Sequence, residues 1–308
     1  MPTYSKINAV DVANLANING VVKANAKPLG IGPFISPSFS DSKAVSKSLT
    51  TGSGQAIQIA STTHFNFVQS DAFSIGFWIR VGWNNNLNTN IHFFAMNDGS
   101  TTGRNQQIRI FYTESNNRLE FRIGHDNNNR SAHFWALHSN LSQTGLPGSA
   151  ASQYWSSSNR GNVNSDNFTH LVITKGTGTT LAANNVAAYW NGTKLPTAFY
   201  TNGNNVGTVS MDASSARRVA LGSNAHTLSK SGNNNETVYN DLTIYNKQLS
   251  DSEVTALYNS GTPKDATTLS TSGNLRGYYT FENSNGNDSS GTSAPAFTVS
   301  GDSNIESI

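Results

Sequence analysis

Hydrophobic and polar residues alternate along many short stretches of the chain after residue 47. In FSIGFWIRV, residues 73–81, every second residue from Phe73 to Val81 is apolar. Successive side chains of a strand point to opposite faces, so this pattern predicts a strand with one face in the core. The same alternation recurs at residues 57–59, 108–112, 119–123, 168–173, 186–190 and 219–221. So many short strands predict an antiparallel sandwich or jelly roll.

A different pattern, NDLTIYNKQLSDSEVTALYNSG at residues 240–261, predicts a strand followed by one short helix. Ser250 precedes Glu253 by three residues, which is the spacing of a capping box. Asn259-Ser260-Gly261 is typical of a helix end. The expected apolar face of the helix consists of Val254, Leu257 and Tyr258. So short a helix is not stable alone, and we expect it to pack on the sandwich.

The predicted connections between strands are of two kinds. Asn191-Gly192 lies between two strand-like segments and predicts a tight type I′ hairpin. The segment from Trp135 to Gly161 has no sustained period and is long for a sandwich connection. Loops of this length are uncommon unless they bind something or move.

The N-terminal segment differs from the rest of the chain. Ile7-Asn8-Ala9-Val10 is echoed eleven residues later by Ile18-Asn19-Gly20-Val21, and residues 28–37 are rich in Gly and Pro. Two copies of a repeat are too few to fold alone, so this segment is either an arm that docks on a partner or a flexible leader. We divide the chain into an arm, residues 1–46, and a sandwich domain, residues 47–308. The residues expected to attach the arm are Ile7, Val10, Leu15, Ile18 and Val21.

The strand, turn and helix of residues 240–259 resemble the ending of laminin-G-like, concanavalin A-like jelly-roll domains. Four other segments agree with that family in order: FSIGFWIRV (73–81), FTHLVITKGTG (168–178), AAYWNGTKL (187–195) and VALGSN (219–224). Together they span most of the chain after residue 50. The resemblance implies an all-β, concanavalin A-like antiparallel sandwich with one short helix near the C-terminal end, preceded by an extended N-terminal arm.

One segment departs from this family pattern. LRGYYTFENSNGNDSSG, residues 275–291, resembles the segment that usually opens such domains, yet here it follows the helix. We expect it to be the final strand of a rearranged sandwich, and the alternative is the beginning of a second copy. This late placement, together with the repeat-bearing arm, is similar to laminin-G-like structural proteins of tailed phages, especially marine ones.

Composition excludes several classes of function. Of the 308 residues 12% are charged, the formal net charge is +2, and there are no cysteines. A nucleic-acid-binding surface is strongly basic, so this balance argues against such a partner. The lack of cysteine excludes thiol catalysis, disulfides and cysteine zinc sites. No apolar run approaches a membrane span, and the N-terminus has no apolar segment of a secretion signal, so we expect neither a membrane anchor nor ordinary secretion.

Concanavalin A-like folds include glucanases, so an endoglycosidase has to be considered. The E-x-D-x-x-E spacing that places two carboxylates side by side on a strand does not occur here. Glu120 is followed at the second position by Arg122, which we expect to balance its charge. The histidines lack zinc-type partner spacing, and we interpret His170, which alternates with Phe168 and Val172, as a packing residue. We therefore expect no enzymatic activity.

A glycan site needs an aromatic platform surrounded by hydrogen-bonding groups. The irregular segment after residue 134 supplies such residues, and Trp83, beside a run of Asn, offers a second platform. The candidates for contact with a glycan or a host surface are Trp135, His138, Asn140, Tyr154, Trp155, Arg160 and Trp83. The alternative is that these aromatic residues anchor the loop or a subunit interface.

Calcium is the most plausible ion, because some laminin-G-like domains bind it through Asp, Asn and carbonyl oxygens. The candidates are Asp98, Asp126 and Asp241. Asp98 and Asp126 also fit ordinary turns, and Asp241 fits the start of a strand.

These observations lead to one expected function and two alternatives. We expect a non-enzymatic virion protein on the surface of a phage particle, as a capsid decoration, head-fibre or tail-fibre component. Its partners would be other copies of itself, a trimer being favoured, capsid or tail proteins, and a host or environmental glycan. The first alternative is a free, calcium-assisted carbohydrate-binding lectin, and the second is an endoglycosidase.

Overall fold

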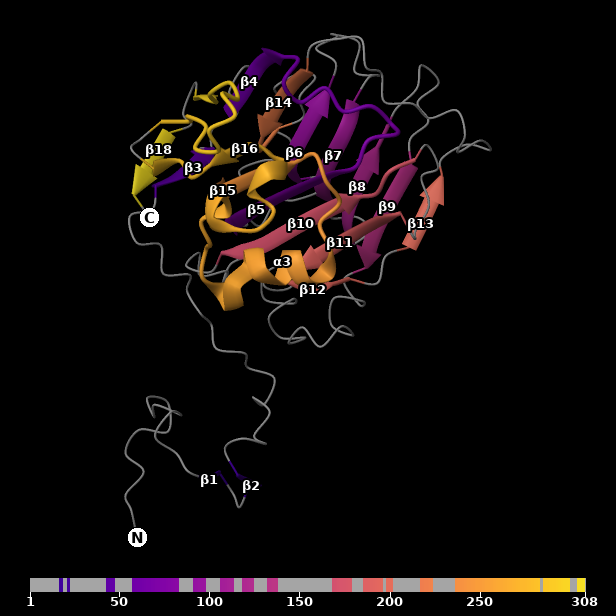
Figure 1. The fold of residues 1–308 in the computed structure, drawn as a ribbon, viewed down its shortest axis with the longest axis vertical. Coiled ribbons are helices and arrows are strands. Elements are labelled where there is room, and N and C mark those ends of the chain that lie inside the picture. The colour runs from indigo at the N-terminus through magenta and orange to yellow at the C-terminus, as the bar shows by residue number, and fades with distance from the viewer. Residues whose placement is uncertain are drawn as a thin grey trace.

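The protein is a sandwich of two antiparallel β-sheets, as seen in a computed structural model (Figure 1). The structure describes residues 17–18, 21–22, 43–47, 57–82, 91–97, 106–113, 118–124, 132–137, 168–178, 185–195, 198–201, 217–223, 236–282, 285–299 and 304–307. The predicted fold class, an antiparallel sandwich with one short helix near its C-terminal end, is confirmed.

The first sheet has eight strands in the order β12–β11–β10–β5–β15–β3–β18, with β16 also paired to β15. Its strands are β3 (Lys43–Lys47), β5 (Phe73–Gly82), β10 (Thr169–Lys175), β11 (Val186–Trp190), β12 (Thr193–Lys194), β15 (Glu236–Tyr245), β16 (Leu275–Tyr279) and β18 (Asn304–Ser307). Because β3 pairs with both β15 and β18, this sheet includes residues on both sides of the boundary that we placed at residue 47.

The second sheet also has eight strands, in the order β13–β9–β8–β7–β6–β14–β4–β17. Its strands are β4 (Ile57–Thr62), β6 (Ile91–Asn97), β7 (Gln106–Thr113), β8 (Arg118–Ile123), β9 (Ala132–Leu137), β13 (Ala198–Thr201), β14 (Arg217–Leu221) and β17 (Thr298–Val299). A separate antiparallel pair is formed by β1 (Asn17–Ile18) and β2 (Val21–Val22).

The core lies between the two sheets and is built from the alternating apolar residues of both. Phe73, Ile75, Phe77 and Ile79 enter it from β5, as the period-two pattern predicted. Residues of β7 and β8, among them Ile110 and Phe121, enter it from the opposite sheet. Burying a side chain of this size contributes about 1.5–3 kcal/mol, so the shared core is the main source of stability.

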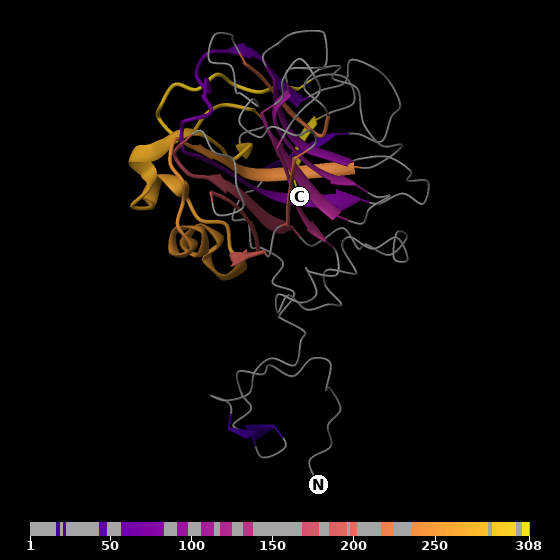
Figure 2. The same ribbon diagram turned by 90° about the vertical axis from the view of Figure 1, so that its right-hand side faces the viewer.

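The helix α3 (Asp251–Tyr258) covers the outer face of the first sheet (Figure 2). Val254 and Leu257 are buried there against Val172 and Tyr245, and Tyr258 is partly buried. The 3₁₀ turns η6 (Asn259–Gly261), η7 (Ala266–Thr268) and η8 (Ser272–Asn274) follow α3 and lead into β16. The predicted packing of this helix on the sandwich is therefore confirmed.

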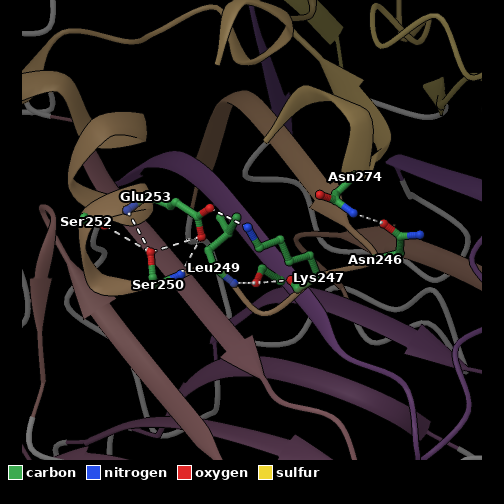
Figure 3. A network of polar contacts seen from close by, with 8 residues as sticks. Asn246, Lys247, Leu249, Ser250, Ser252, Glu253 and Asn274 are labelled. Carbon is green, nitrogen blue, oxygen red and sulfur yellow. Dashed lines mark hydrogen bonds and ion pairs between the residues drawn. The ribbon is translucent and has the colours of Figure 1, made fainter. Parts of the chain in front are cut away.

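The ends of α3 have the predicted structure. Ser250 accepts a hydrogen bond from the amide of Glu253, while the Glu253 carboxylate accepts one from the amide of Ser250 over 2.8 Å (Figure 3). Lys247 also forms an ion pair with Glu253, which fixes the turn between β15 and the helix. At the other end Asn259 adopts the left-handed conformation with φ 48° and stops the helix.

The other predicted turn is also confirmed. Asn191 and Gly192 have φ 48° and 75°, the positive values that a type I′ turn requires, and they join β11 to β12. An added Cβ on Gly192 would lie 2.8 Å from Tyr258 Cδ1, so the hairpin also lies close against α3.

The segment 275–291 completes this sandwich. Strand β16 pairs with β15, with Leu242 opposite Tyr279 and Thr243 opposite Tyr278. Further along, Phe281 and Phe297 enter the same core as the two sheets. The segment therefore belongs to this sandwich, as expected, and does not begin a second copy, but β16 is not the final strand because β17 and β18 follow it.

Two details differ from the sequence expectation. Asp241 does not start a strand, because β15 begins at Glu236 and Asp241 lies at a bulge within it, with φ 47°. Trp135 does not belong to an irregular loop, because β9 extends to Leu137. Both residues lie inside strands because neighbouring strands pair with them, and a local sequence pattern does not show this pairing.

Candidate functional site

The two outer faces of the sandwich differ in chemistry. The first sheet is covered by α3 and the segment after it, where Tyr189, Leu249 and Ala266 form an apolar cluster. The second sheet instead carries charged and aromatic side chains on strands β6, β7 and β8, which lie side by side (Figure 1). We call this set, His92, Arg109, Phe111, Glu120 and Arg122, the polar face.

Strand register brings the residues of the polar face together. On β6 and β7, His92 lies opposite Phe111. On β7 and β8, Phe111 lies opposite Glu120 and Arg109 lies opposite Arg122. Ile110 and Phe121, the residues between them along each strand, are in the core, so alternation places the polar set on the other side.

Phe111 is the centre of the polar face. The guanidinium carbons of Arg109 and Arg122 each lie 4.9 Å from its ring centroid. The His92 ring stacks on it with a centroid distance of 5.4 Å and an interplanar angle of 29°. A cation over an aromatic ring is stabilised by the negative ring face, so Phe111 holds both guanidinium groups in place.

Glu120 and Arg122 form the ion pair that their spacing predicted. Arg122 Nε donates to Glu120 Oε1 over 2.7 Å. The Glu120 side chain is 1% exposed and the Arg122 side chain is 28% exposed. A buried carboxylate needs such a partner, since leaving it unpaired would cost several kcal/mol. One side of the Arg122 guanidinium is thus used by Glu120, while the residue still reaches solvent.

Arg109 is held differently. Its Nη2 donates to His92 Nε2 over 3.0 Å, which requires that nitrogen of the ring to be an unprotonated acceptor. Its Nε has no hydrogen-bond partner, and within the described residues it forms no ion pair. Burial and the nearby charge of Arg122 lower the pKa of Arg109 to about 9, while the charge of Glu120 acts in the opposite direction without a direct contact. The polar face therefore contains a partly buried cation whose charge no direct carboxylate partner balances.

The sequence candidates for glycan contact fall mostly outside the described residues. This holds for His138, Asn140, Tyr154, Trp155, Arg160 and Trp83. Trp135 is described, and backbone register places it opposite Glu120, next to the polar face on β9. These candidates remain predictions.

The spacing of Glu120 and Arg122 predicted their pairing, but the sequence did not identify the polar face as a site. The alternation in IRIFY (108–112) and LEFRI (119–123) places two Arg, a Phe and a Glu on the side away from the core. Charged and aromatic residues together on the outer side of two consecutive strands could have indicated a binding surface. Period alone does not show that these strands are neighbours of β6, which provides His92.

The attachment candidates are only partly described. Ile18 lies opposite Val21 in the β1–β2 pair. Ile7, Val10 and Leu15 lie outside the described residues. The role of these residues in attachment remains a prediction.

Of the calcium candidates, Asp241 is described, and Asp98 and Asp126 are not. Asp241 Oδ1 accepts a hydrogen bond from the Tyr278 hydroxyl over 2.6 Å. Burial, with smaller contributions from Glu282 and Asp265, raises the pKa of Asp241 to about 7. In the described part of the chain no three His, Cys, Asp or Glu residues are grouped to hold a metal ion. Calcium binding at Asp241 stays a prediction.

His170 has the packing role that its alternation indicated. Its ring lies 4.9 Å from Trp78 and 6.0 Å from Tyr258, measured between centroids. Burial lowers its pKa to about 3, so the ring is neutral at ordinary pH. This aromatic stack ties the end of α3 to strands β5 and β10.

No helix in the described residues combines the length and apolar character needed to cross a membrane.

No protein-family model matches the chain, and no curated protein matches it. Solved structures with a similar arrangement include a candidate carbohydrate-binding protein from Bacteroides ovatus ATCC 8483, at 13% identity and a TM-score of 0.49. That comparison covers 87% of this chain and 60% of the other. The binding domain of botulinum neurotoxin serotype D/C matches at 18% identity and a TM-score of 0.38, over 63% of this chain and 37% of the other. The serotype G binding domain matches at 17% identity and 0.36, over 62% and 37%. The chain thus spans less than two thirds of each of these chains, and likenesses this distant say nothing about a ligand.

Proposed function

We propose that this chain is a non-enzymatic adhesion protein that binds glycans through the polar face of its second sheet. The observation that carries the proposal is the cluster of Arg109, Phe111, Glu120 and Arg122, supported by His92. Glycan sites in proteins combine directed hydrogen-bonding groups with aromatic rings, and this cluster provides both on one surface. Trp135 lies at the adjoining register position and is the candidate stacking residue.

We propose a non-enzymatic protein because the second sheet offers too few carboxyl groups for glycoside hydrolysis. Hydrolysis of a glycosidic bond by the usual route needs two carboxyl groups about 5–10 Å apart. Within the described strands of the second sheet Glu120 is the one acidic residue, and it is paired with Arg122. An endoglycosidase at this face would therefore need a second acid from elsewhere in the chain.

A glycan array probed with the full-length chain tests the binding proposal. The expected result is reproducible binding to at least one class of glycan that persists in the presence of a calcium chelator. Binding that disappears with the chelator would instead favour the calcium-assisted lectin. Absence of binding to every glycan would overturn the proposal.

We further propose that the protein is displayed on a phage particle as a capsid decoration, head-fibre or tail-fibre component. This part rests on the sequence arrangement, namely the repeat-bearing segment 1–46 and the placement of residues 275–291 after the helix. The proposed partners are further copies of the chain, as a trimer, and capsid or tail proteins contacted through segment 1–46. Mass spectrometry of purified virions should detect the protein in stoichiometric amounts, and virions without it would contradict this placement.

A further inference from the structure

The charge on the polar face suggests which class of glycan it binds. The titratable groups on this side of the second sheet whose side chains the structure describes are His92 on β6, Arg109 on β7, Glu120 and Arg122 on β8, and Arg218 on β14; register also places Arg118 and His133 on it. Arg218 belongs to this side because Val219, its neighbour in β14, is in the core. Among the described side chains, three arginines thus share one surface with a single carboxylate, and that carboxylate is bound to Arg122.

Arg109 has unused hydrogen-bonding capacity. Its Nε is buried without a partner, and its contacts are a ring nitrogen of His92 and the face of Phe111. The Nε atom itself is enclosed by the protein, but the Arg109 side chain is only partly buried, so a ligand oxygen would accept a hydrogen bond from its exposed part. Oxygen from a neutral hydroxyl would satisfy the hydrogen bond but would not balance the guanidinium charge.

The guanidinium of Arg109 is also held in a fixed orientation. Phe111 lies under it, and His92 accepts from its Nη2, so its plane is set before any ligand arrives. A planar guanidinium matches the two oxygens of a carboxylate or sulfate, and charge-assisted bonds of this kind are about twice as strong as neutral ones. Because the side chain is already ordered, binding costs little further conformational entropy.

We infer that the polar face binds acidic glycans, with Arg109 as the residue that recognises the carboxylate or sulfate group of the sugar. This inference rests on the proposed function, because it names the ligand class of the same surface. Arg122 contributes positive charge beside it, and Glu120 fixes the position of Arg122 rather than contacting the ligand.

The test compares neutral glycans with acidic ones on the full-length chain. The array contains neutral glycans, carboxylate-bearing glycans with sialic or uronic acid, and sulfated glycans. We expect binding to be confined to the carboxylate-bearing or the sulfated set, and these two sets show which group Arg109 recognises. Binding to neutral glycans alone, or equally to both kinds, would overturn the inference while leaving the proposed function standing. Binding to none would overturn the proposed function itself.

Two variants of Arg109 test the assigned residue. Arg109→Gln should weaken binding to the preferred acidic glycan by roughly tenfold or more, since a charge-assisted bond is lost. Arg109→Lys keeps the charge but loses the planar pair of donors, and should lie between that variant and the unmodified chain. Arg276→Gln is the matched control, because Arg276 is exposed on β16 of the other sheet, and its affinity should be unchanged. All three variants are first checked for an unchanged thermal unfolding profile. If folded Arg109→Gln and Arg109→Lys both bind as tightly as the unmodified chain, the assignment is wrong.

Discussion

The Tyr278 hydroxyl donates a hydrogen bond to Asp241 Oδ1 over 2.6 Å, joining β16, which follows the helix, to the bulge in β15. The two residues lie 37 positions apart in the sequence. Their contact shows that the segment after the helix is built into the same sandwich. It also places a carboxyl group where it is unfavourable for it to ionise.

Asp241 should make the protein less stable as the pH rises from about 4 to 7. Its pKa in the folded state is raised to about 7, above the value near 3.9 of an unfolded chain. Between these values the folded state holds a proton that the unfolded state has lost, so stability falls as pH increases through this window. The Asp241→Asn variant keeps an acceptor for Tyr278 without the ionisation.

The comparison is made by chemical denaturation of both proteins at pH 4 and pH 8. Asn also suits the positive φ of this position and can stabilise the protein at every pH. The informative quantity is therefore how the difference in unfolding free energy between the two proteins changes from pH 4 to pH 8. We expect the advantage of Asp241→Asn to grow by about 1–2 kcal/mol between the two values, since partial solvent exposure screens the charge. An equal difference at both pH values would show that Asp241 does not ionise with a raised pKa.

Lys175 should be essential for stability although it lies far from the polar face. It is fully buried, and its Nζ donates to the carbonyl oxygens of Gln69, Asp71 and Gly176 over 2.5, 2.9 and 2.9 Å, with Gly178 at 3.3 Å. The Lys175 ammonium thus satisfies a cluster of carbonyl oxygens, as a bound cation would. Lys175→Met keeps the length of the side chain but leaves these carbonyls unsatisfied, and should destabilise the protein by about 2–4 kcal/mol.

Lys194→Met is the control for this experiment. The Lys194 side chain is 55% exposed, and its nitrogen lies 3.6 Å from Asp251. Exposed ion pairs contribute little, so this variant should change the free energy of unfolding by at most about 1 kcal/mol. Urea denaturation of both variants measures the two effects, and similar losses would contradict the assigned role of Lys175.

Much of the first sheet and its helix could be predicted because the determining signals are local. Ser250 and Glu253 are three residues apart, and Asn191-Gly192 is a dipeptide. In both cases a few neighbouring residues determine the local backbone structure. The polar face could not be predicted in this way. Arg109, Arg122 and His92 come from three strands, and their meeting depends on the order of strands in the sheet and on register.

The capping box at the start of α3 should contribute measurably to stability. Ser250 Oγ accepts from the Glu253 amide, so Ser250→Ala removes one partner of an otherwise unpaired helix donor. Loss of such a cap costs about 1 kcal/mol. Ser289→Ala, at an exposed serine outside the capping network, is the control and should change the free energy of unfolding by less than about 0.5 kcal/mol when both variants are compared by thermal unfolding.

Two glycine variants can distinguish the effect of the close contact between the β11–β12 hairpin and α3 from the effect of backbone strain. Gly192 and Gly178 have φ 75° and 101°, so alanine is strained at both. A Cβ at Gly192 would meet Tyr258 Cδ1 at 2.8 Å, whereas one at Gly178 would meet nothing within 4 Å.

Gly178→Ala should therefore cost about 1 kcal/mol and Gly192→Ala about 1–3 kcal/mol more, because the second also displaces the ring of Tyr258. Equal losses in equilibrium unfolding would mean that the hairpin and the helix are not packed as described.

The central claim, that the polar face is the glycan-binding surface, is tested most directly by nuclear magnetic resonance of the arginine side chains. The full-length chain is labelled with ¹⁵N and titrated with the acidic glycan that binds best on the array. The Nε–H resonances of Arg109 and Arg122 should shift with glycan concentration along the binding curve, while that of Arg276 stays in place. Shifts at Arg276 or over α3, with Arg109 and Arg122 unchanged at saturation, would contradict the account.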